Sequence, residues 1–355
     1  MYANPRGALA EAVTRGEAPD TGLLGQNHLG ELGIEAVIRE PALRRGSSLG
    51  GLRHRIVWNA RELTLPWELG GFDVACTPLA AAFPLAARLR GRPRTVILNV
   101  SLCTTYDRSS RSRRRFLRTA LRAASAVVCF SRAQRERLLA QTGLPPGRVH
   151  VVLLGVDERF YAPATPPGDG YVLAVGRDLA RDYGTFARAV AGLPCRSIVV
   201  ASERNLRGLR LPDTVEVRLD VSYPGLRSLY AGAGCVVVPT RRESHPYGAD
   251  CSGQTVLLDA MAMGRPAVLS ERTTLDDYVR EGETALTVPP EDAGALRGAI
   301  ERLLGDRALA EALGGAGRRL VEARHTTRQL AGRLAPILLA AGSKQGVDVD
   351  GSAGA

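Results

Sequence analysis

The sequence predicts an α/β protein made of two domains, each built on a parallel β-sheet. The chain of 355 residues, 45% of them hydrophobic, is long enough for two compact cores. Short apolar runs alternate with longer stretches of helical periodicity, which is the βαβ rhythm of parallel sheets. A Pro- and Gly-rich segment at 161–170 interrupts this rhythm and predicts a linker. We therefore expect a first domain over 1–160, a second over 161–341 and a disordered tail over 342–355.

Five short apolar runs predict the strands of the first domain. Each is separated from the next by a loop or a stretch with helical spacing, which makes the strands parallel. Little room remains for an opening strand between Met1 and Pro5, so we expect either a start further upstream or a short first strand. The predicted strands are 34–38, 74–76, 95–99, 126–130 and 149–154.

The second domain repeats the same pattern after the linker. Its predicted strands are 171–175, 197–201, 215–219, 235–239 and 266–270, and helices at 293–304, 307–313 and 320–339 close the chain. Ligands of such sheets bind at the carboxyl ends of the strands. The loops that follow these strands are therefore the places to look for a site.

The cysteines and the apolar runs exclude several classes of protein. The six cysteines are scattered, with no CxxC pair and no Cys/His cluster at metal-ligand spacing, which favours a reducing compartment and no metal site. No apolar run approaches the roughly 20 residues of a membrane-spanning helix, and no signal peptide is recognisable. We therefore expect a cytoplasmic protein.

The net charge of +11 comes almost wholly from arginine. Lys344 is the single lysine and lies in a tail of Gly, Ser and Asp. A Walker-type phosphate loop and a pyridoxal phosphate site both need a positioned lysine, so both classes are excluded. The arginines are spread over both halves, and a GC-rich coding bias explains them as well as a nucleic-acid ligand does. We expect no nucleic-acid partner.

One dense basic cluster lies at 108–122. Its arginines lead into Phe116, Leu117 and Leu121 on an apolar stripe. This pattern is typical of a surface helix that touches anionic lipid or an acidic partner, and it predicts weak peripheral binding at the inner face of a membrane. The alternative is a solvated arginine face.

The loop after the first strand of the second domain carries a glycine and two arginines. Gly176 and Arg177 leave the strand, and Arg181 follows before the next helix. Arginine keeps its charge at any working pH and presents a planar fork of donors, which suits the oxygens of a diphosphate. The alternative is a pair of surface arginines beside Asp178 and Asp182.

A second candidate anion site lies at the helix predicted after Cys251. Ser252 or Gly253 stands near the helix start, where free backbone N–H groups favour an anion. Asp259 lies two turns further on a mostly apolar face, where an unpaired carboxylate is unfavourable unless it accepts hydrogen bonds. A ribose diol satisfies it, and a neighbouring arginine is the alternative partner.

Four segments together resemble glycosyltransferase family 4. They are Gly176-Arg177 with Arg181, the run LYAGAGCVVVP at 229–239, the run SGQTVLLDAMAMGRP at 252–266 and DYVREG at 277–282, and the likeness extends back to 126–131 and 155–157. It covers the second half of the chain well and is loose before about Ala123. The family implies the GT-B fold, in which two Rossmann-like domains, one for the acceptor and one for the nucleotide-sugar donor, face a cleft.

The resemblance implies roles for the residues singled out above. A basic pair at Arg177 and Arg181 neutralises the donor diphosphate, and the acidic residue at the position of Asp259 binds the ribose hydroxyls. The remaining donor-binding positions are Gly176, Ser252, Gly253, Gln254 and Thr255.

Three of the positions that depart from the family pattern bear on the donor site. Arg181 stands where the family commonly has Lys, and Asp259 stands where it has Glu, so charge is kept but reach is altered. The family's second acidic residue, separated by seven residues from the ribose carboxylate, is Cys251 here. We therefore expect Glu243, Asp250 or the backbone at 252–254 to contact the donor sugar instead.

The resemblance implies retaining transfer of a hexose-type sugar from a nucleotide diphosphate sugar, without a metal, a cofactor or an obligatory protein nucleophile. The leaving phosphate oxygen takes the acceptor proton while fixed positive charge stabilises the departing diphosphate. The acceptor is a small molecule, a glycan or a lipid-linked group. Two alternatives stay open: an epimerase-like enzyme acting on nucleotide sugars with the same fold, and a catalytically inactive homologue that binds polyanions.

Overall fold

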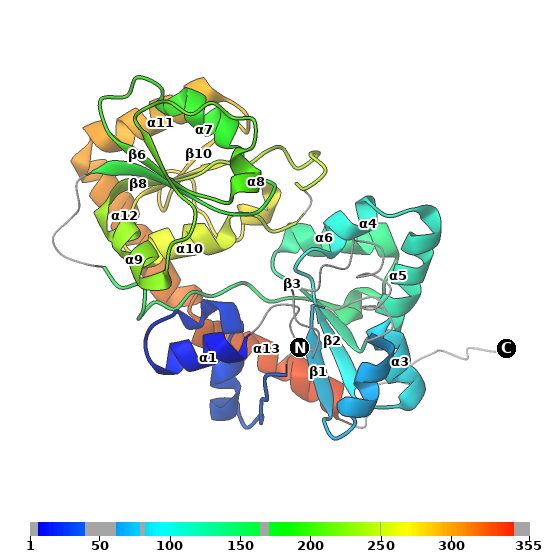
Figure 1. The fold of residues 1–355 in the computed structure, drawn as a ribbon. Coiled ribbons are helices and arrows are strands. Elements are labelled where there is room, and N and C mark those ends of the chain that lie inside the picture. The colour runs from blue at the N-terminus through cyan, green and yellow to red at the C-terminus, as the bar shows by residue number, and fades with distance from the viewer. Residues whose placement is uncertain (1–5, 40–61, 79–81, 164–169, 249, 344–355) are drawn as a thin grey trace.

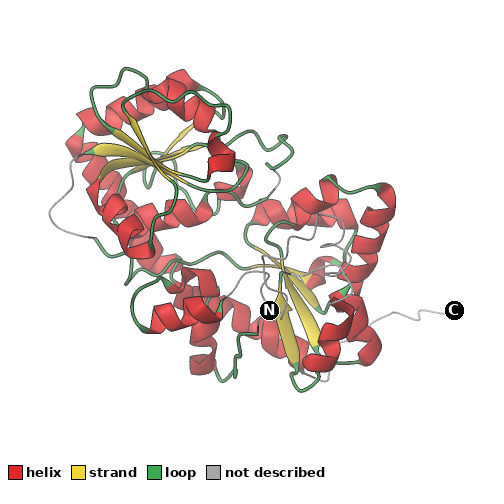
Figure 2. Cartoon of the chain, in the orientation of Figure 1, coloured by secondary structure: helices red, strands yellow, loops and turns green. Residues whose placement is uncertain are grey.

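The computed structural model describes residues 6–39, 62–78, 82–163, 170–248 and 250–343. They form two parallel sheets flanked by helices, as predicted (Figures 1 and 2). One sheet has the strand order β1-β2-β3-β4 and the other the order β10-β9-β8-β5-β6-β7. The crossovers in the second sheet bring β5 and β8 together at its centre, so the loops that follow these two strands meet.

The first sheet contains four of the five predicted strands. They are β1 (Val74–Thr77), β2 (Arg94–Leu98), β3 (Ala126–Cys129) and β4 (Val149–Val151). Around them lie α1 (Gly7–Thr14), η1 (Asp20–Leu23), η2 (Gln26–Leu32), α3 (Phe83–Arg90), α4 (Leu102–Asp107), α5 (Arg111–Ala123), α6 (Arg132–Thr142) and η3 (Pro146–Arg148).

The strand predicted at 34–38 is wrong. These residues have no regular structure and pair with no strand among the described residues, and Val37 is 46% exposed. The run is short and holds the charged Glu35 at its second position. An apolar run forms a strand only where a neighbouring strand and a buried face stabilise it.

The second sheet contains all five predicted strands and one that the sequence did not predict. The strands are β5 (Tyr171–Val175), β6 (Ser197–Val200), β7 (Val215–Arg218), β8 (Ala233–Val238), β9 (Ala267–Ser270) and β10 (Leu286–Val288). The missed strand, β10, is an edge strand of three residues, too short for a periodic signal. The helices that follow the linker along the chain are α7 (Tyr183–Val190), α8 (Glu203–Leu206), α9 (Tyr223–Gly232), α10 (Gln254–Ala262), η4 (Thr273–Leu275), α11 (Ala293–Gly305), α12 (Arg307–Arg324) and α13 (Thr327–Gly342).

The C-terminal helices differ from the prediction in their boundaries. The predicted helix 307–313 continues to Arg324, and the predicted helix 320–339 is divided at His325. The division follows from a capping box, in which the Thr326 hydroxyl accepts from the Gln329 backbone N–H and the Gln329 side chain accepts from the Thr326 N–H. Gly342, where the predicted tail begins, is still part of α13, and residues 344–355 lie outside the described residues.

The last helix, α13, returns to the first sheet. It lies within the range 161–341 predicted for the second domain, yet it packs against β1, β2 and η2 (Figure 1). Its buried face carries Leu330, Leu334 and Leu338 at helical spacing. The two sheets are therefore joined by the end of the chain as well as by the linker.

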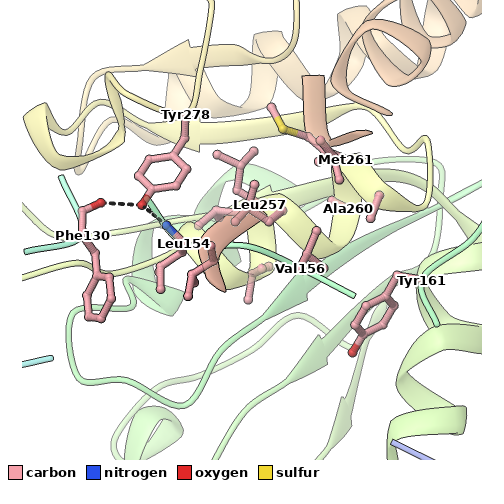
Figure 3. Close-up of a cluster of buried hydrophobic side chains, with 14 of the residues drawn as sticks. Phe130, Leu154, Val156, Tyr161, Leu257, Ala260, Met261 and Tyr278 are labelled. Atoms are coloured by element: carbon pink, nitrogen blue, oxygen red, sulfur yellow. Dashed lines mark hydrogen bonds between the residues drawn. The ribbon is translucent and has the colours of Figure 1, made fainter. Parts of the chain in front are cut away.

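A shared apolar cluster also joins the two halves. It contains Leu98 and Val128 from the first sheet, Leu173 and Val236 from the second, and most of α10. Figure 3 shows its centre, where the Tyr278 hydroxyl donates to the Phe130 carbonyl and accepts from the Leu154 backbone N–H at 2.9 Å. Within the described part of the chain, no helix is long and apolar enough to cross a membrane.

Candidate active site

Arg181 occupies the space above Gly176, at the carboxyl end of β5. Gly176 has a φ of +150°, and a Cβ atom at this position would lie 2.0 Å from Arg181 Nε. Only glycine leaves room for the guanidinium at this turn, and it tolerates the left-handed backbone. The motif predicted from the sequence therefore has a steric cause: the glycine lets the arginine lie against the strand end.

The Arg181 guanidinium is buried rather than on the surface. Its side chain is 2% exposed, and Nε lies 2.9 Å from Asp178 Oδ2. Nη1 is buried and has no hydrogen-bond partner among the described residues. A desolvated cation with an unused donor is unfavourable unless an acceptor binds there. Arg181 is thus prepared to receive an anion.

Asp178 is a site residue that the sequence analysis treated only as part of the alternative reading. Its Oδ1 accepts from Ser252 Oγ at 2.6 Å and from the Ala180 N–H at 3.1 Å. The side chain is 41% exposed, so its desolvation is partial. Desolvation acts to raise the pKa of this carboxyl, but the Arg181 charge and the Ser252 hydrogen bond outweigh it and hold the pKa below its usual value. Asp178 is therefore ionised at neutral pH and holds Arg181 and Ser252 together.

The alternative of a surface ion pair fits Arg177 better than Arg181. Arg177 is 54% exposed, donates to the Leu219 carbonyl and lies 3.6 Å from Asp220 Oδ1. Asp182 pairs with neither arginine and caps α7 through Thr185 instead. The two predicted diphosphate ligands therefore have different partners, on the loops that follow β7 and β5.

The start of α10 lies next to Arg181. Gly253 is the N-cap residue with a φ of +97°, and a Cβ there would lie 2.7 Å from Val238 Cγ1 and 3.4 Å from Arg181 Nη1. Thr255 is exposed in the first turn, whereas the Gln254 side chain is buried and donates to the Thr274 carbonyl at 3.0 Å. The positive end of a helix and a buried guanidinium thus meet at one point, an arrangement that favours an anion.

Asp259 is buried on α10, and the alternative arginine partner is absent among the described residues. Its Oδ1 has no hydrogen-bond partner there. Burial raises the pKa of Asp259 well above its usual range, and the nearby Asp157 adds to the rise, while the Tyr230 hydroxyl opposes it. A carboxyl in this state gains from any ligand that donates hydrogen bonds to it.

The two carboxylates predicted to contact the donor sugar are both engaged by protein donors. Glu243 Oε1 accepts from the Thr273 N–H at 2.7 Å and from its hydroxyl at 2.9 Å. Asp250 accepts from the first domain: from the Thr104 N–H at 2.7 Å, the Cys103 N–H at 3.3 Å and Gln134 Nε2 at 3.1 Å. Asp250 is thus a contact between domains in this structure.

Arg272 is a second residue that the sequence analysis missed. Its buried guanidinium donates to the carbonyls of Arg241, Gly248 and Asp250. It therefore holds the loop that carries both Glu243 and Asp250. The signal in the sequence is weak, because Arg272 follows β9 without a motif. Among the described residues, no group of acidic, His and Cys side chains is placed to hold a metal ion.

Two family models match this chain, one in each half. The model described as Glycosyltransferase Family 4 matches residues 18–160, and the model described as Glycosyl transferases group 1 matches residues 172–306. Together they span both sheets and the loops that form the site.

Curated relatives match over part of their length. The alpha-maltose-1-phosphate synthase of Mycolicibacterium smegmatis is 31% identical over 229 residues, which are 57% of this chain and 59% of that protein. The alpha-D-kanosaminyltransferase of Streptomyces kanamyceticus is 26% identical over 55% of each chain. The chain thus spans less than two thirds of the length of these relatives.

Solved structures share the fold across most of the chain. The sucrose-phosphate synthase of Thermosynechococcus elongatus has a TM-score of 0.68 at 23% identity and covers 90% of this chain and 92% of its own. Anabaena HepE, solved in complex with UDP and glucose, has a TM-score of 0.66 at 15% identity and covers 84% of both chains. The fold is therefore GT-B. With a family model in each half, a GT-B fold and glycosyltransferases among its relatives, the chain belongs to glycosyltransferase family 4.

Proposed function

We propose that the protein transfers a sugar from a nucleotide diphosphate sugar to an acceptor, with retention of configuration. One observation carries the proposal: a buried guanidinium with an unused donor, Arg181 Nη1, lies at the N-terminus of α10, and the buried Asp259 carboxyl lies on the same helix. These groups match the two polar parts of a nucleoside diphosphate, an anion and a diol.

The diphosphate binds at Arg181 and the first turn of α10. Arg177 reaches the same ligand by leaving its contact with the Leu219 carbonyl, since its exposed side chain is free to change rotamer. As the bond to the sugar breaks, negative charge grows on the diphosphate, and these fixed donors stabilise it. The positive charge comes from the chain itself, so the proposed reaction needs no metal and no protein nucleophile.

The ribose binds at Asp259. The distance from the start of α10 to Asp259 is two turns, roughly 10 Å at 1.5 Å per residue, which suits the spacing from a diphosphate to its ribose. Asp259 has an unpartnered oxygen that can accept from the ribose hydroxyls. Binding then replaces an unfavourable buried group by a hydrogen-bonded one.

A thermal-shift screen of nucleotide diphosphate sugars tests the donor class. A ligand that binds the folded state raises the melting temperature by mass action. UDP-glucose is the first donor to test, because HepE was solved in complex with it. Relatives named as an alpha-maltose-1-phosphate synthase and an alpha-D-kanosaminyltransferase support a hexose. A shift with at least one nucleotide sugar supports the proposal, and no shift with any of them contradicts it.

The arginine-rich helix α5 supports a second part of the proposal, cytoplasmic action at the inner face of a membrane. Five of its arginines are exposed and form no ion pair among the described residues: Arg111, Arg113, Arg115, Arg118 and Arg122. The predicted apolar stripe is wrong in part, because Leu117 and Leu121 are buried against the domain. Of the three apolar residues of the predicted stripe, Phe116 is the one that is exposed, at 43%. The helix therefore binds anionic lipid by charge more than by insertion.

A further inference from the structure

One loop of the second domain holds both ends of helix α4 in the first domain. Asp250 accepts from the N–H groups of Cys103 and Thr104, in the first turn of α4. At the other end, the guanidinium of Arg108, the C-cap residue, lies over the Tyr247 ring at 4.3 Å from its centroid. We call Tyr247, Gly248 and Asp250 the loop clasp.

The contact at Asp250 is buried and involves several donors of the other domain. The carboxylate is buried, and its three donors belong to the other domain, 116 to 147 residues away in sequence. Backbone N–H groups at a helix start have no partner within their own helix, so a carboxylate that accepts from two of them forms a strong contact. Gln134 completes the set and is itself held by the Asn99 carbonyl and the Phe130 N–H.

The loop clasp is held by several contacts within its own domain. The Arg272 guanidinium donates to the carbonyls of Gly248 and Asp250, and the Gly248 N–H donates to the His245 carbonyl at 2.7 Å. A Cβ at Gly248 would lie 2.4 Å from the Arg242 carbonyl oxygen, so the loop also packs closely on itself. Because the loop contacts both ends of α4, it fixes the position of α4 relative to the second domain.

The loop clasp is continuous in sequence with the start of α10. Asp250 is separated from Ser252 by one residue, and Ser252 bonds the carboxylate that holds Arg181. The proposed leaving-group site and the first domain are thus connected through a few residues. Transfer requires the reacting atoms of acceptor and donor to lie about 3–3.5 Å apart in the right orientation, and a misplacement of about 1 Å can lower the rate about 100-fold.

We propose that Asp250 is a positioning residue: it caps α4 of the other domain and thereby fixes how the two domains are placed relative to each other for transfer. This rests on the proposed function. The Asp250 carboxylate does not touch the donor, so the loss of its contact lowers turnover and leaves nucleotide affinity unchanged. Its role differs from the sugar contact that the sequence suggested.

Asp250→Asn is the informative variant. The side chain keeps nearly the same size, but one of its two acceptor oxygens is replaced by an NH₂ group that faces the protein donors. We expect faster hydrogen exchange at the Cys103 and Thr104 amides, a kcat lowered by on the order of 10- to 100-fold, and an unchanged Kd for the nucleoside diphosphate. Arg242→Ala is the control, since Arg242 lies on the same stretch and pairs with Glu291 of its own domain. It should leave the exchange of these two amides and kcat unchanged.

Three outcomes overturn the proposal. Unchanged exchange at Cys103 and Thr104 shows that the carboxylate does not cap α4. Faster exchange with an unchanged kcat shows that the cap does not serve transfer. A weakened Kd together with a lowered kcat shows that Asp250 contacts the donor. If the parent protein transfers no sugar, the proposed function fails, whereas the exchange data still test the cap.

Discussion

At the scale of single residues, the site depends on polar groups that are buried before any ligand binds. Among the described residues, Arg181 Nε and Nη1 have no hydrogen-bond partner, although Nε is ion-paired with Asp178, and Asp259 Oδ1 has none either. In most proteins such groups find a partner, and each one left alone lowers stability by about 1–3 kcal/mol. Their presence at one end of a sheet indicates a binding site more strongly than the exposed charges of the chain do.

Replacement of Arg181 by Ala should lower turnover by on the order of 100-fold or more, because the variant loses a charge contact that strengthens as the diphosphate leaves. Arg177→Ala should act in the same direction. Arg181→Lys, which restores the residue common in the family, is the matched control and should retain most of the activity. Steady-state kinetics with the donor found by thermal shift measures the effect, and unchanged kinetics in both Ala variants would remove the diphosphate assignment.

Replacement of Asp259 by Asn should weaken binding of the nucleoside diphosphate roughly tenfold or more and leave the fold intact. Burial favours the neutral carboxyl of Asp259, but ribose hydroxyls that donate to it favour the carboxylate, which accepts from both. An amide offers one acceptor and one misplaced donor, a difference of about 1–3 kcal/mol. Asp259→Glu is expected to bind as well as the parent or better. Calorimetry decides: normal affinity in Asp259→Asn combined with a collapsed melting temperature makes Asp259 a purely structural residue.

At the scale of elements, the sequence predicted buried strands well and contacts between elements poorly. β5, β6 and β9 are buried along their whole length, and their sequences are apolar except for one terminal serine in β6 and one in β9. The run 34–38 is also largely apolar, but it pairs with no strand among the described residues. The three residues of β10 are too few for a pattern. The α10 motif was recognised because its residues are adjacent in sequence.

The site contacts that sequence reasoning missed join residues far apart in the chain. Asp178 meets Ser252 across 74 residues, and Asp250 meets Thr104 across 146. A single sequence holds no periodic signal for such pairs, because they arise from the strand order of the sheets and from the docking of the domains. Arg272 is similar, since its partners are backbone carbonyls and place no constraint on sequence.

Helix α5 should bind anionic vesicles through its exposed arginines. Each arginine near an anionic surface contributes about 1 kcal/mol, so replacing Arg111, Arg115 and Arg118 by Gln should reduce partitioning by on the order of 100-fold. The matched control replaces Arg204, Arg207 and Arg210, three exposed arginines of the second domain, and should bind like the parent. Flotation with anionic and neutral liposomes measures the difference, and equal flotation of the parent with both leaves only a solvated face.

At the scale of the whole molecule, the two sheets are joined by a crossover of the chain near His325. The His325 ring is buried, and its Nδ1 lies 3.2 Å from the Leu154 carbonyl. Burial lowers the pKa of His325 to about 4, against the opposing effect of the Leu154 carbonyl. The folded protein therefore keeps this ring neutral at a pH where the unfolded chain binds a proton.

The free energy of unfolding should fall as the pH drops through the window from about 6.5 to about 4, because the unfolded state binds more protons there. The loss from this one group is on the order of 3 kcal/mol. In the His325→Gln variant the side chain stays neutral, so the free energy of unfolding should depend less steeply on pH in this window. Urea unfolding at several pH values measures it, and parallel curves for parent and variant would exclude His325 as the cause.

The central claim concerns the reaction itself, and proton NMR of a nucleotide sugar incubated with the protein tests it most directly. Water serves as the acceptor when no other is present, and the anomer first released can be read before it equilibrates. We predict that nucleoside diphosphate and free sugar appear in equal amounts and that the first sugar keeps the anomeric configuration of the donor. Conversion of the donor into an isomeric nucleotide sugar without release of nucleoside diphosphate, or release of the inverted anomer, would contradict this account.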